Sequence, residues 1–277
     1  YMWITRFLLL FALAAHGFSL SGFAQRPFSE ADGSIHRLPE ALAGKTLSLN
    51  PRYFVQALPE AKAEAEAEAK ADKPLPLLIF LHGGGGVGQD IERIARQSGF
   101  LRNALRRHSK EAWIVAPQAA KSPRKAGGSR GGWQVADLDL LLAHLLQTLP
   151  IDPDRVYLTG ISMGGYGTLM WAGYRPEHFA AIAPMVGGLG PGGPKDITKD
   201  LDLWGRNLAK IPMRAYYGAK DKIVPPDRGE MIREAIDQAG GKQAEVIILQ
   251  DKGHNAASTP YSQPEFFQWL FSQRKEQ

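Results

Sequence analysis

Six short apolar runs follow one another from residue 77 onward. They occupy residues 77–81, 113–116, 156–159, 180–186, 213–217 and 245–249. Each run is continuous rather than alternating with polar positions, which is typical of strands buried on both faces of a parallel sheet. The runs therefore predict the strands of a mostly parallel central sheet.

Amphipathic stretches lie between these runs. Residues 135–149 carry leucine at 138, 141, 142, 145, 146 and 149, a spacing that gives a helix one broad apolar face, and Pro150 ends the segment. Further helices are predicted at 164–174, 227–239 and 263–274. Strand and helix alternate in a single series, which indicates one α/β domain with a doubly wound sheet and helices on both faces.

The chain before this series has a different pattern. Residues 45–50 and 52–58 meet at the turn pair Asn50-Pro51 and predict the two strands of a hairpin. Residues 61–72 then alternate alanine with Glu, Lys and Asp, so this tract has no large apolar side chain to bury. We interpret residues 61–73 as a solvated surface insertion in the domain.

The N-terminus has the features of a targeting segment. Arg6 is the only charge among residues 1–24, residues 7–15 are apolar, and residues 22–24 offer the small side chains of a cleavage site. We expect residues 1–24 to be a secretory signal peptide and residues 25–277 to form the exported domain, periplasmic or secreted. A retained membrane anchor is the alternative, but polar residues interrupt the apolar stretch well before the roughly 20 residues that a span requires.

Composition excludes several classes of site. The 277 residues contain no cysteine, which rules out disulfides, thiolate metal sites and a thiol nucleophile. Thirty-three Lys and Arg against 28 Asp and Glu give a net charge of +5, too modest a balance to indicate a nucleic-acid partner. His, Asp and Glu do not cluster at metal-ligand spacing, so we expect neither a metal nor another cofactor.

The sequence Gly160-Ile161-Ser162-Met163-Gly164 fits the pattern Gly-x-Ser-x-Gly. A predicted strand precedes it and a predicted helix follows it, which is the context in which this motif presents a nucleophilic serine on a sharp turn. Small neighbours are needed there because larger side chains would collide with the turn or the substrate. Ser162 is therefore the candidate nucleophile, and the alternative is a serine in an ordinary loop or helix cap.

A serine nucleophile needs a base and a third group that orients the base. With this motif the acid and then the histidine follow the serine along the chain. Of the two histidines after Ser162, His178 lies in a turn before the next strand, whereas His254 follows the last predicted strand and is the candidate base. Asp221 is the candidate acid because it emerges at the carboxyl end of a strand. The other carboxylates considered in the interval are Asp196, Asp200, Asp202, Asp227 and Asp237.

A glycine-rich segment follows the first long core strand. His82 is followed by four glycines, residues 83–86, here called the glycine loop. Glycine lets backbone N–H groups approach the oxyanion of a tetrahedral intermediate. We expect one donor to be the N–H of Met163 and the other that of Gly84 or a neighbouring glycine. The alternative, a phosphate-binding loop, lacks the Gly-Lys-Ser/Thr ending.

A basic, glycine-containing stretch at residues 121–130 precedes Trp133. It is interpreted as a solvated loop. The more specific hypothesis is that the loop borders the substrate pocket and that Trp133 contacts the substrate.

The motifs at 81–85, 154–165 and 253–254 together resemble the phospholipase/carboxylesterase and feruloyl-esterase-like branch of the α/β-hydrolases. The resemblance runs from about residue 74 to the C-terminus. It implies an α/β-hydrolase fold, a Ser162–Asp221–His254 triad, and hydrolysis of carboxylic esters without a cofactor. The short connection after residue 186 predicts no large lid domain, which suits small or polymer-attached esters. The alternatives are a prolyl-oligopeptidase-like serine peptidase and a non-catalytic binding protein with the same fold.

Overall fold

The computed structural model describes residues 33–58, 74–121, 132–190, 193 and 195–275. The expected signal peptide and the insertion at 61–73 lie outside the described residues, as does the basic loop from residue 122 onward. Within the described residues, none of the helices combines the length and apolar character needed to cross a bilayer.

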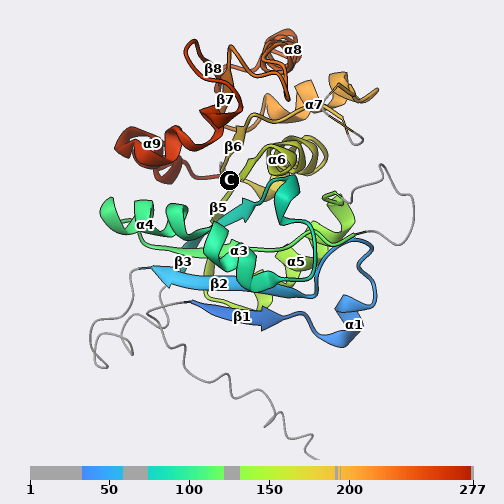
Figure 1. Cartoon of the computed structure of the whole chain (residues 1–277), viewed down its shortest axis with the longest axis vertical. Helices are drawn as coiled ribbons and strands as arrows, with labels where there is room; N and C mark the ends of the chain where they lie inside the picture. Colours follow the sequence, from blue (N-terminus) through green and yellow to red (C-terminus); the bar gives the residue numbers. More distant parts are fainter. Residues whose placement is uncertain (1–32, 59–73, 122–131, 191–192, 194, 276–277) are drawn as a thin grey trace, which may run out of the picture.

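One sheet of eight strands runs through the described part of the chain (Figure 1), in the order β1-β2-β4-β3-β5-β6-β7-β8. β1 and β2 pair antiparallel, as do β2 and β4, and all other neighbours are parallel. The carboxyl ends of β3 to β8 therefore meet at one side of the sheet, here called the carboxyl edge, and their starts form the amino edge. The strands are β1 Ser34–Arg37, β2 Arg52–Leu58, β3 Leu75–Leu81, β4 Ala112–Ala116, β5 Ile151–Ile161, β6 Ala181–Met185, β7 Met213–Gly218 and β8 Ala244–Leu249.

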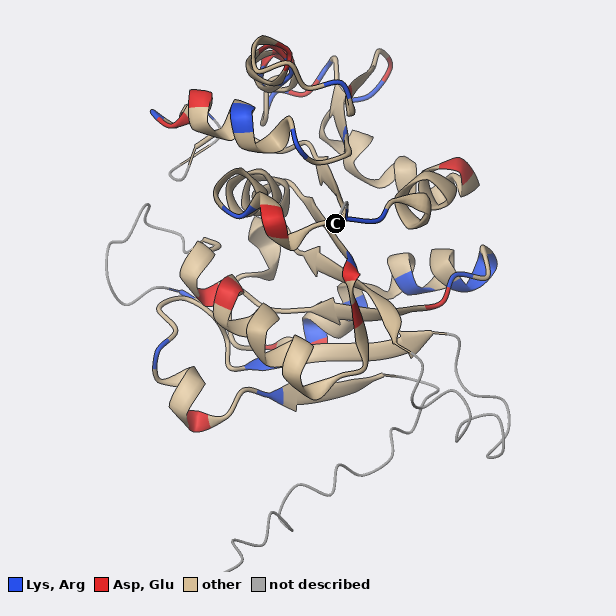
Figure 2. Ribbon diagram, turned by 180° about the vertical axis from the view of Figure 1, so that it is seen from behind, with Lys and Arg blue, Asp and Glu red and all other residues tan. Residues whose placement is uncertain are grey.

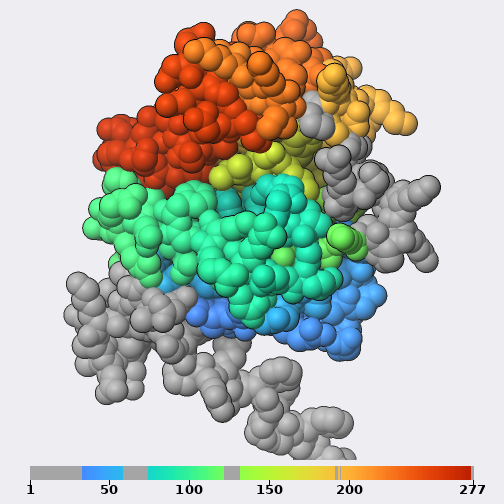
Figure 3. Space-filling model, viewed as in Figure 1, coloured from blue at the N-terminus to red at the C-terminus, as the bar shows by residue number. Residues whose placement is uncertain are grey.

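Helices cover both faces of this sheet. One apolar core lies under α5, α6, α7 and α8, and a second lies under α3, α4 and α9. Figure 3 shows the C-terminal segment, in red, against the green segment that contains α4, and the short helix η4 contacts both α4 and α9. The helices are α1 Glu40–Ala43, α3 Ile91–Gln97, α4 Gly99–Arg107, α5 Val135–Thr148, α6 Met163–Tyr174, α7 Leu201–Leu208, α8 Asp227–Gln238 and α9 Pro264–Ser272, with 3-10 turns η1 Gly84–Gly86, η2 Pro176–His178, η3 His254–Ser258 and η4 Pro260–Ser262.

The six predicted apolar runs are strands β3 to β8, and the four predicted helices are α5, α6, α8 and α9. The mostly parallel sheet with helices on both faces is thereby confirmed. The described part of the β6–β7 connection adds α7, which packs against α6 and α8 in the helical layer rather than forming a separate lid.

The predicted hairpin is wrong in one of its strands. β2 pairs with β1, and residues 45–50 form no strand beyond an isolated bridge between Leu49 and Ala119. The cause is the buried carboxylate of Asp137, which accepts hydrogen bonds from the backbone N–H groups of Leu47 and Ser48 at 2.8 Å each. Those amides are satisfied by a side chain and are not available to a neighbouring strand.

Charged residues of both signs are distributed over the elements rather than gathered by sign (Figure 2). Several ion pairs among the described residues join side chains that are both substantially exposed, such as Arg233 with Asp237 on α8. Such pairs contribute little to stability, so the fold depends chiefly on its two apolar cores.

Candidate active site

Ser162 lies at the sharp turn between β5 and α6. Its backbone has φ 56° and ψ −115°, a region that residues with a side chain rarely adopt and that often marks a functional site. The turn is held on both sides: the Ser162 N–H donates to the Met185 carbonyl at 2.9 Å, and its own carbonyl accepts from the Tyr166 N–H at 3.0 Å. This strained geometry presents the side chain of Ser162 at the carboxyl edge.

The glycines of the motif are required by close packing. A Cβ atom on Gly164 would overlap the carbonyl of Leu81, and one on Gly160 would overlap the carbonyl of Gly164. At both positions the backbone at the start of α6 lies directly against the backbone at the end of a strand, β3 at Leu81 and β5 at Gly160. The two glycines therefore allow the turn to be this tight, as the motif predicts.

Asp221 and His254 are hydrogen-bonded to each other across two strand ends. Asp221 follows β7 and His254 begins η3 after β8. His254 Nδ1 lies 2.8 Å from Asp221 Oδ2, and Asp221 Oδ1 accepts the N–H groups of Ile223 and Val224 at 2.8 and 3.0 Å. The Asp221 side chain is fully buried, whereas 28% of the His254 side chain is exposed. Donation from Nδ1 leaves Nε2 as the nitrogen that can accept a proton.

All three predicted residues lie at the carboxyl edge, and two of them are hydrogen-bonded to each other. Asp221 and His254 form a pair, and η3 packs against the ends of β6 and β7, beside the Ser162 turn. No hydrogen bond joins Ser162 to His254, although the structure describes both residues. Catalytic hydrogen bonds in proteins without substrate are often long and tighten only in the complex.

The glycine loop lies directly beside the serine. A Cβ on Gly83 would be 3.6 Å from Ser162 Cβ, while Gly84 and Gly85 have no other atoms within 4 Å of that position. Met163 is the first residue of α6, so its N–H has no partner within the helix. The two predicted oxyanion donors, Gly84 and Met163, thus belong to segments on either side of Ser162, and their roles stay predictions.

His82, at the start of the glycine loop, is neutral and structural. Its Nε2 lies 3.0 Å from the Ala119 N–H, which can only donate, so Nδ1 carries the proton and donates to the Gly83 carbonyl at 2.7 Å. Burial lowers the pKa of His82 to about 4, with a smaller contribution from Arg93 and an opposing one from the Gly83 hydrogen bond. His82 therefore holds the loop and does not titrate near neutral pH.

Trp133 is buried beneath the glycine loop. Its ring centroid lies 4.8 Å from that of His82, and a Cβ on Gly167 of α6 would be 2.6 Å from the Trp133 ring. Only 5% of the residue is exposed. The structure thus shows Trp133 supporting His82, and a contact with substrate stays a prediction.

His178, the other histidine that follows Ser162 in the chain, has its partners elsewhere. Its Nε2 lies 3.3 Å from Asp139 Oδ1 on α5, and the same carboxylate accepts from Trp171 and Arg175. η2, which contains His178, precedes β6 and so lies toward the amino edge. This arrangement is consistent with choosing His254 as the base.

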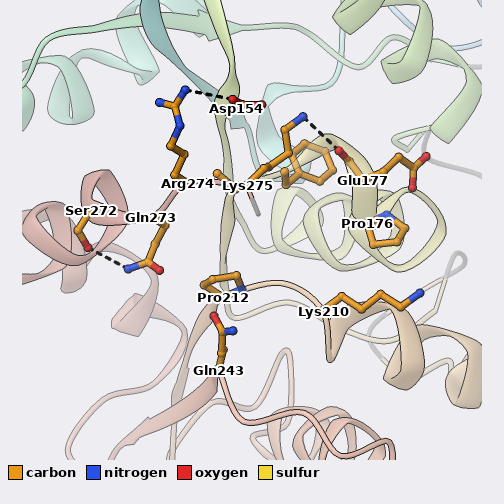
Figure 4. A pocket seen from close by; sticks show the side chains of 12 residues that line it. Asp154, Pro176, Glu177, Lys210, Pro212, Gln243, Ser272, Gln273, Arg274 and Lys275 are labelled. Carbon is orange, nitrogen blue, oxygen red and sulfur yellow. Dashed lines mark hydrogen bonds and ion pairs between the residues drawn. The ribbon is translucent and has the colours of Figure 1, made fainter. Parts of the chain in front are cut away.

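A cavity of about 780 Å³ opens at the amino edge, on the opposite side of the sheet from Ser162. Figure 4 shows two of its basic side chains already engaged: Arg274 is paired with Asp154 at 3.0 Å, and Lys275 donates to the Glu177 carbonyl at 3.3 Å. It contains no candidate nucleophile and base pair. The carboxyl edge remains the candidate active site.

No group of three or more His, Asp or Glu side chains capable of holding a metal ion occurs in the described part of the chain.

Comparison with known proteins identifies the family. Residues 64–238, more than half of the chain, match the Esterase family, described as "Putative esterase". The chain belongs to this esterase family. The match supports an enzyme of the carboxylesterase type, and the fold is that of the α/β-hydrolases.

Curated relatives of this esterase-family chain align over a limited region. A "Putative carboxymethylenebutenolidase" of Escherichia coli (strain K12) is 32% identical over 109 residues, which are 37% of this chain and 37% of that protein. "Poly(3-hydroxyalkanoate) depolymerase C" of Paucimonas lemoignei is 30% identical over 109 residues, 34% of this chain and 25% of the relative. The chain thus matches well under half the length of these relatives.

Solved structures agree in fold. A thermostable esterase superposes with a TM-score of 0.66 at 21% identity, covering 89% of this chain and 64% of that chain. A ferulic acid esterase gives 0.59 at 17% identity, covering 86% and 98% respectively. At these identities the likeness shows the fold alone.

Proposed function

We propose that this protein hydrolyses carboxylic esters through an acyl-enzyme formed on Ser162. The observation that carries the proposal is the buried Asp221 bonded to His254 at the same sheet edge as the strained Ser162 turn. An acid that orients a histidine at the same sheet edge as a partly buried serine on a sharp turn is an arrangement that can activate a weak hydroxyl nucleophile. Membership of an esterase family supports the same reaction class.

In the proposed first half-reaction, His254 Nε2 removes the proton from Ser162 Oγ as that oxygen attacks the ester carbonyl. The carbonyl oxygen becomes an oxyanion, which accepts hydrogen bonds from Met163 N–H and from Gly84 or a neighbouring glycine. The intermediate collapses, the C–O bond to the alcohol breaks, and His254 donates its proton to the departing alcohol oxygen. Asp221 stabilises the imidazolium in between.

In the second half-reaction, His254 removes a proton from water as the water oxygen attacks the acyl-enzyme. The second tetrahedral intermediate collapses with cleavage of the bond to Ser162 Oγ, which takes the proton back from His254. The carboxylic acid leaves and the enzyme returns to its starting state.

Small or polymer-attached esters are the proposed substrates. The described β6–β7 connection contributes α7 to the helical layer, so the site is not enclosed by a separate lid of described residues. One relative is named a poly(3-hydroxyalkanoate) depolymerase, and that name favours esters within a polymer. Strong activation at a lipid–water interface, with little turnover of soluble short-chain esters, would contradict this substrate class.

The test of the reaction is the Ser162→Ala variant assayed on p-nitrophenyl acetate and butyrate. We expect kcat to fall by at least ~10³-fold, because the nucleophile is lost while binding and oxyanion donors remain. Ser109→Ala is the matched control, since Ser109 is the other serine with a positive φ among the described residues, 49°, and is exposed after α4. Retention of esterase activity by Ser162→Ala would overturn the proposal.

Two further measurements separate the alternative functions. A fluorophosphonate probe should label the wild type and not Ser162→Ala, whereas a non-catalytic protein of this fold would stay unlabelled. Peptide p-nitroanilides should be turned over much more slowly than the esters, whereas a serine peptidase would show the opposite preference.

Export is proposed separately from the reaction. A secretory signal over residues 1–24 predicts a mature protein beginning at Gln25. N-terminal sequencing of the protein purified from the periplasm or medium checks this, and recovery of the uncut chain in the membrane fraction would favour the anchor instead.

A further inference from the structure

Gln118 is a buried glutamine placed against the glycine loop. It follows β4 at the carboxyl edge and is 1% exposed. Its Nε2 lies 2.9 Å from the Gly86 carbonyl and 3.1 Å from the Asp90 carbonyl. Carbonyl oxygens only accept hydrogen bonds, so both hydrogens of one amide nitrogen are used to hold the end of the loop.

The other end of the Gln118 carboxamide is fixed by Asn50. Gln118 Oε1 accepts from Asn50 Nδ2 at 2.7 Å, and Asn50 Oδ1 accepts from the Arg52 N–H at 3.0 Å. The Asn50 N–H also donates to the Gln118 carbonyl at 2.9 Å. These partners fix the orientation of both side-chain amides. Gln118 Nε2, Gln118 Oε1, Asn50 Nδ2 and Asn50 Oδ1 each have a hydrogen-bond partner. A network satisfied in this way is rigid.

Ala119, the next residue, holds the loop at two more points. Its N–H donates to His82 Nε2, and its carbonyl accepts from the Gly88 N–H at 3.0 Å. Between these anchors Gly84 and Gly85 have open space around their α-carbons. The position of the open part of the loop therefore depends on anchors at His82, Gly86 and Gly88, and Gln118 supplies the side-chain anchor at Gly86.

We propose that Gln118 is a positioning residue for catalysis: its carboxamide holds the glycine loop where the loop's N–H groups meet the oxyanion formed on the Ser162 adduct. The inference rests on the proposed esterase function. Gln118 does not touch the reacting atoms. Its identity as an amide matters because a carboxylate here would face two carbonyl oxygens, and an apolar side chain would leave both carbonyls and Asn50 without their partner.

The experiment compares Gln118→Met with Gln56→Met. Gln56 is also 1% exposed but lies in β2, where its Oε1 accepts from Arg102 at 3.1 Å, away from the loop. For Gln118→Met we expect kcat on p-nitrophenyl acetate to fall ~10- to ~100-fold with little change in KM, because misplacing a preorganised donor weakens transition-state binding. Gln56→Met should keep kcat within about threefold of the wild type, since its loss is confined to stability.

A transition-state mimic provides the readout that a purely structural role would not move. A trifluoromethyl ketone adds to the serine hydroxyl and forms a tetrahedral oxyanion, so its inhibition constant should rise for Gln118→Met by about the same factor as kcat/KM falls. The constant should stay near the wild-type value for Gln56→Met. Thermal unfolding of each variant confirms that the assayed protein is folded.

The outcomes divide cleanly. A folded Gln118→Met protein with wild-type kcat, or an equal loss of kcat in Gln56→Met, would overturn the positioning role. If Gln118→Met does not fold, Asn50→Ala decides by the same criteria, because it keeps Gln118 and removes the partner that orients the carboxamide, together with the acceptor of the Arg52 N–H. Failure of the esterase proposal itself would look different, because the wild type would then lack activity or Ser162→Ala would retain it.

Discussion

At the scale of single residues, the buried Asp221 carboxylate selects the tautomer of His254. In Asp221→Asn the amide Oδ1 can still accept the N–H groups of Ile223 and Val224, which turns the NH₂ group toward His254 Nδ1. Nδ1 then becomes an acceptor and Nε2 carries the proton, so it cannot act as a base. We expect kcat to fall ~10⁴-fold with the fold intact. Esterase kinetics check this against Asp227→Asn, an exposed carboxylate on α8, and a loss under tenfold would contradict it.

The buried His82 should make the free energy of unfolding depend on pH. Burial holds its folded-state pKa at about 4, below the ordinary 6.5, so between these values the unfolded chain binds a proton that the folded protein does not. Stability is then fully present above pH 6.5 and declines by up to ~3 kcal/mol as the pH falls toward 4. His82→Gln should remove this component. Urea unfolding of both proteins at pH 7, 5.5 and 4.5 measures it, and parallel pH dependences would refute the assignment.

The candidate site could be predicted from sequence because the motif at residues 160–164 indicates the nucleophile, and the order of serine, acid and histidine along the chain indicates its partners. Ser162, Asp221 and His254 each follow an apolar run, and the structure brings Asp221 and His254 into contact as that order predicts. Gln118 and Asp137 could not be identified from sequence. Their partners are backbone groups 28 to 90 positions away in the chain, and no local pattern encodes such contacts.

At the scale of elements, the close packing of α6 on β3 depends on Gly164 having no side chain. A Cβ at Gly164 would overlap the Leu81 carbonyl, so Gly164→Ala should displace the helix, cost roughly 2–4 kcal/mol of unfolding free energy and abolish activity. Gly99→Ala is the matched helix substitution: its Cβ would meet only the far end of Arg102, and we expect it to raise stability by up to ~1 kcal/mol. Urea unfolding compares the two, and equal effects would refute the packing argument.

Periodicity predicted the long elements and missed the short ones. α5 has leucine along two full turns and is found within a residue of its predicted bounds, whereas α3 and α7 have only seven and eight residues, about two turns each. The error at residues 45–50 has a different origin. A β-like pattern was present, but a carboxylate from α5 bound the amides that a strand would have needed.

At the scale of the whole molecule, alternation predicted a parallel sheet but not its order. Adjacent strands in the chain, β3 and β4, exchange places relative to β2, and nothing in either sequence specifies which neighbour each takes. The order matters for function because it sets the ends of β5, β6, β7 and β8 side by side. A nucleophile, an acid and a base separated by up to 92 positions in sequence (254 − 162) thereby share one edge.

At the amino edge of the sheet, hydrogen bonds hold residues 273–275 in place, far from the proposed chemistry at the carboxyl edge. Substitutions there should therefore change stability without changing activity. The buried Tyr157 hydroxyl donates to the Gln273 carbonyl at 2.8 Å, and the Lys275 N–H donates to the Asp154 carbonyl at 3.0 Å.

Tyr157→Phe removes the first of these hydrogen bonds and should lower the unfolding free energy by about 1 kcal/mol. Arg274→Ala, which breaks the ion pairs of the half-exposed Arg274 side chain with Asp152 and Asp154, should cost less. Both variants should retain wild-type kcat and KM, because these bonds lie at the amino edge and the proposed chemistry at the carboxyl edge. A fall in kcat measured well below the unfolding temperature would show instead that the two edges are coupled through β5.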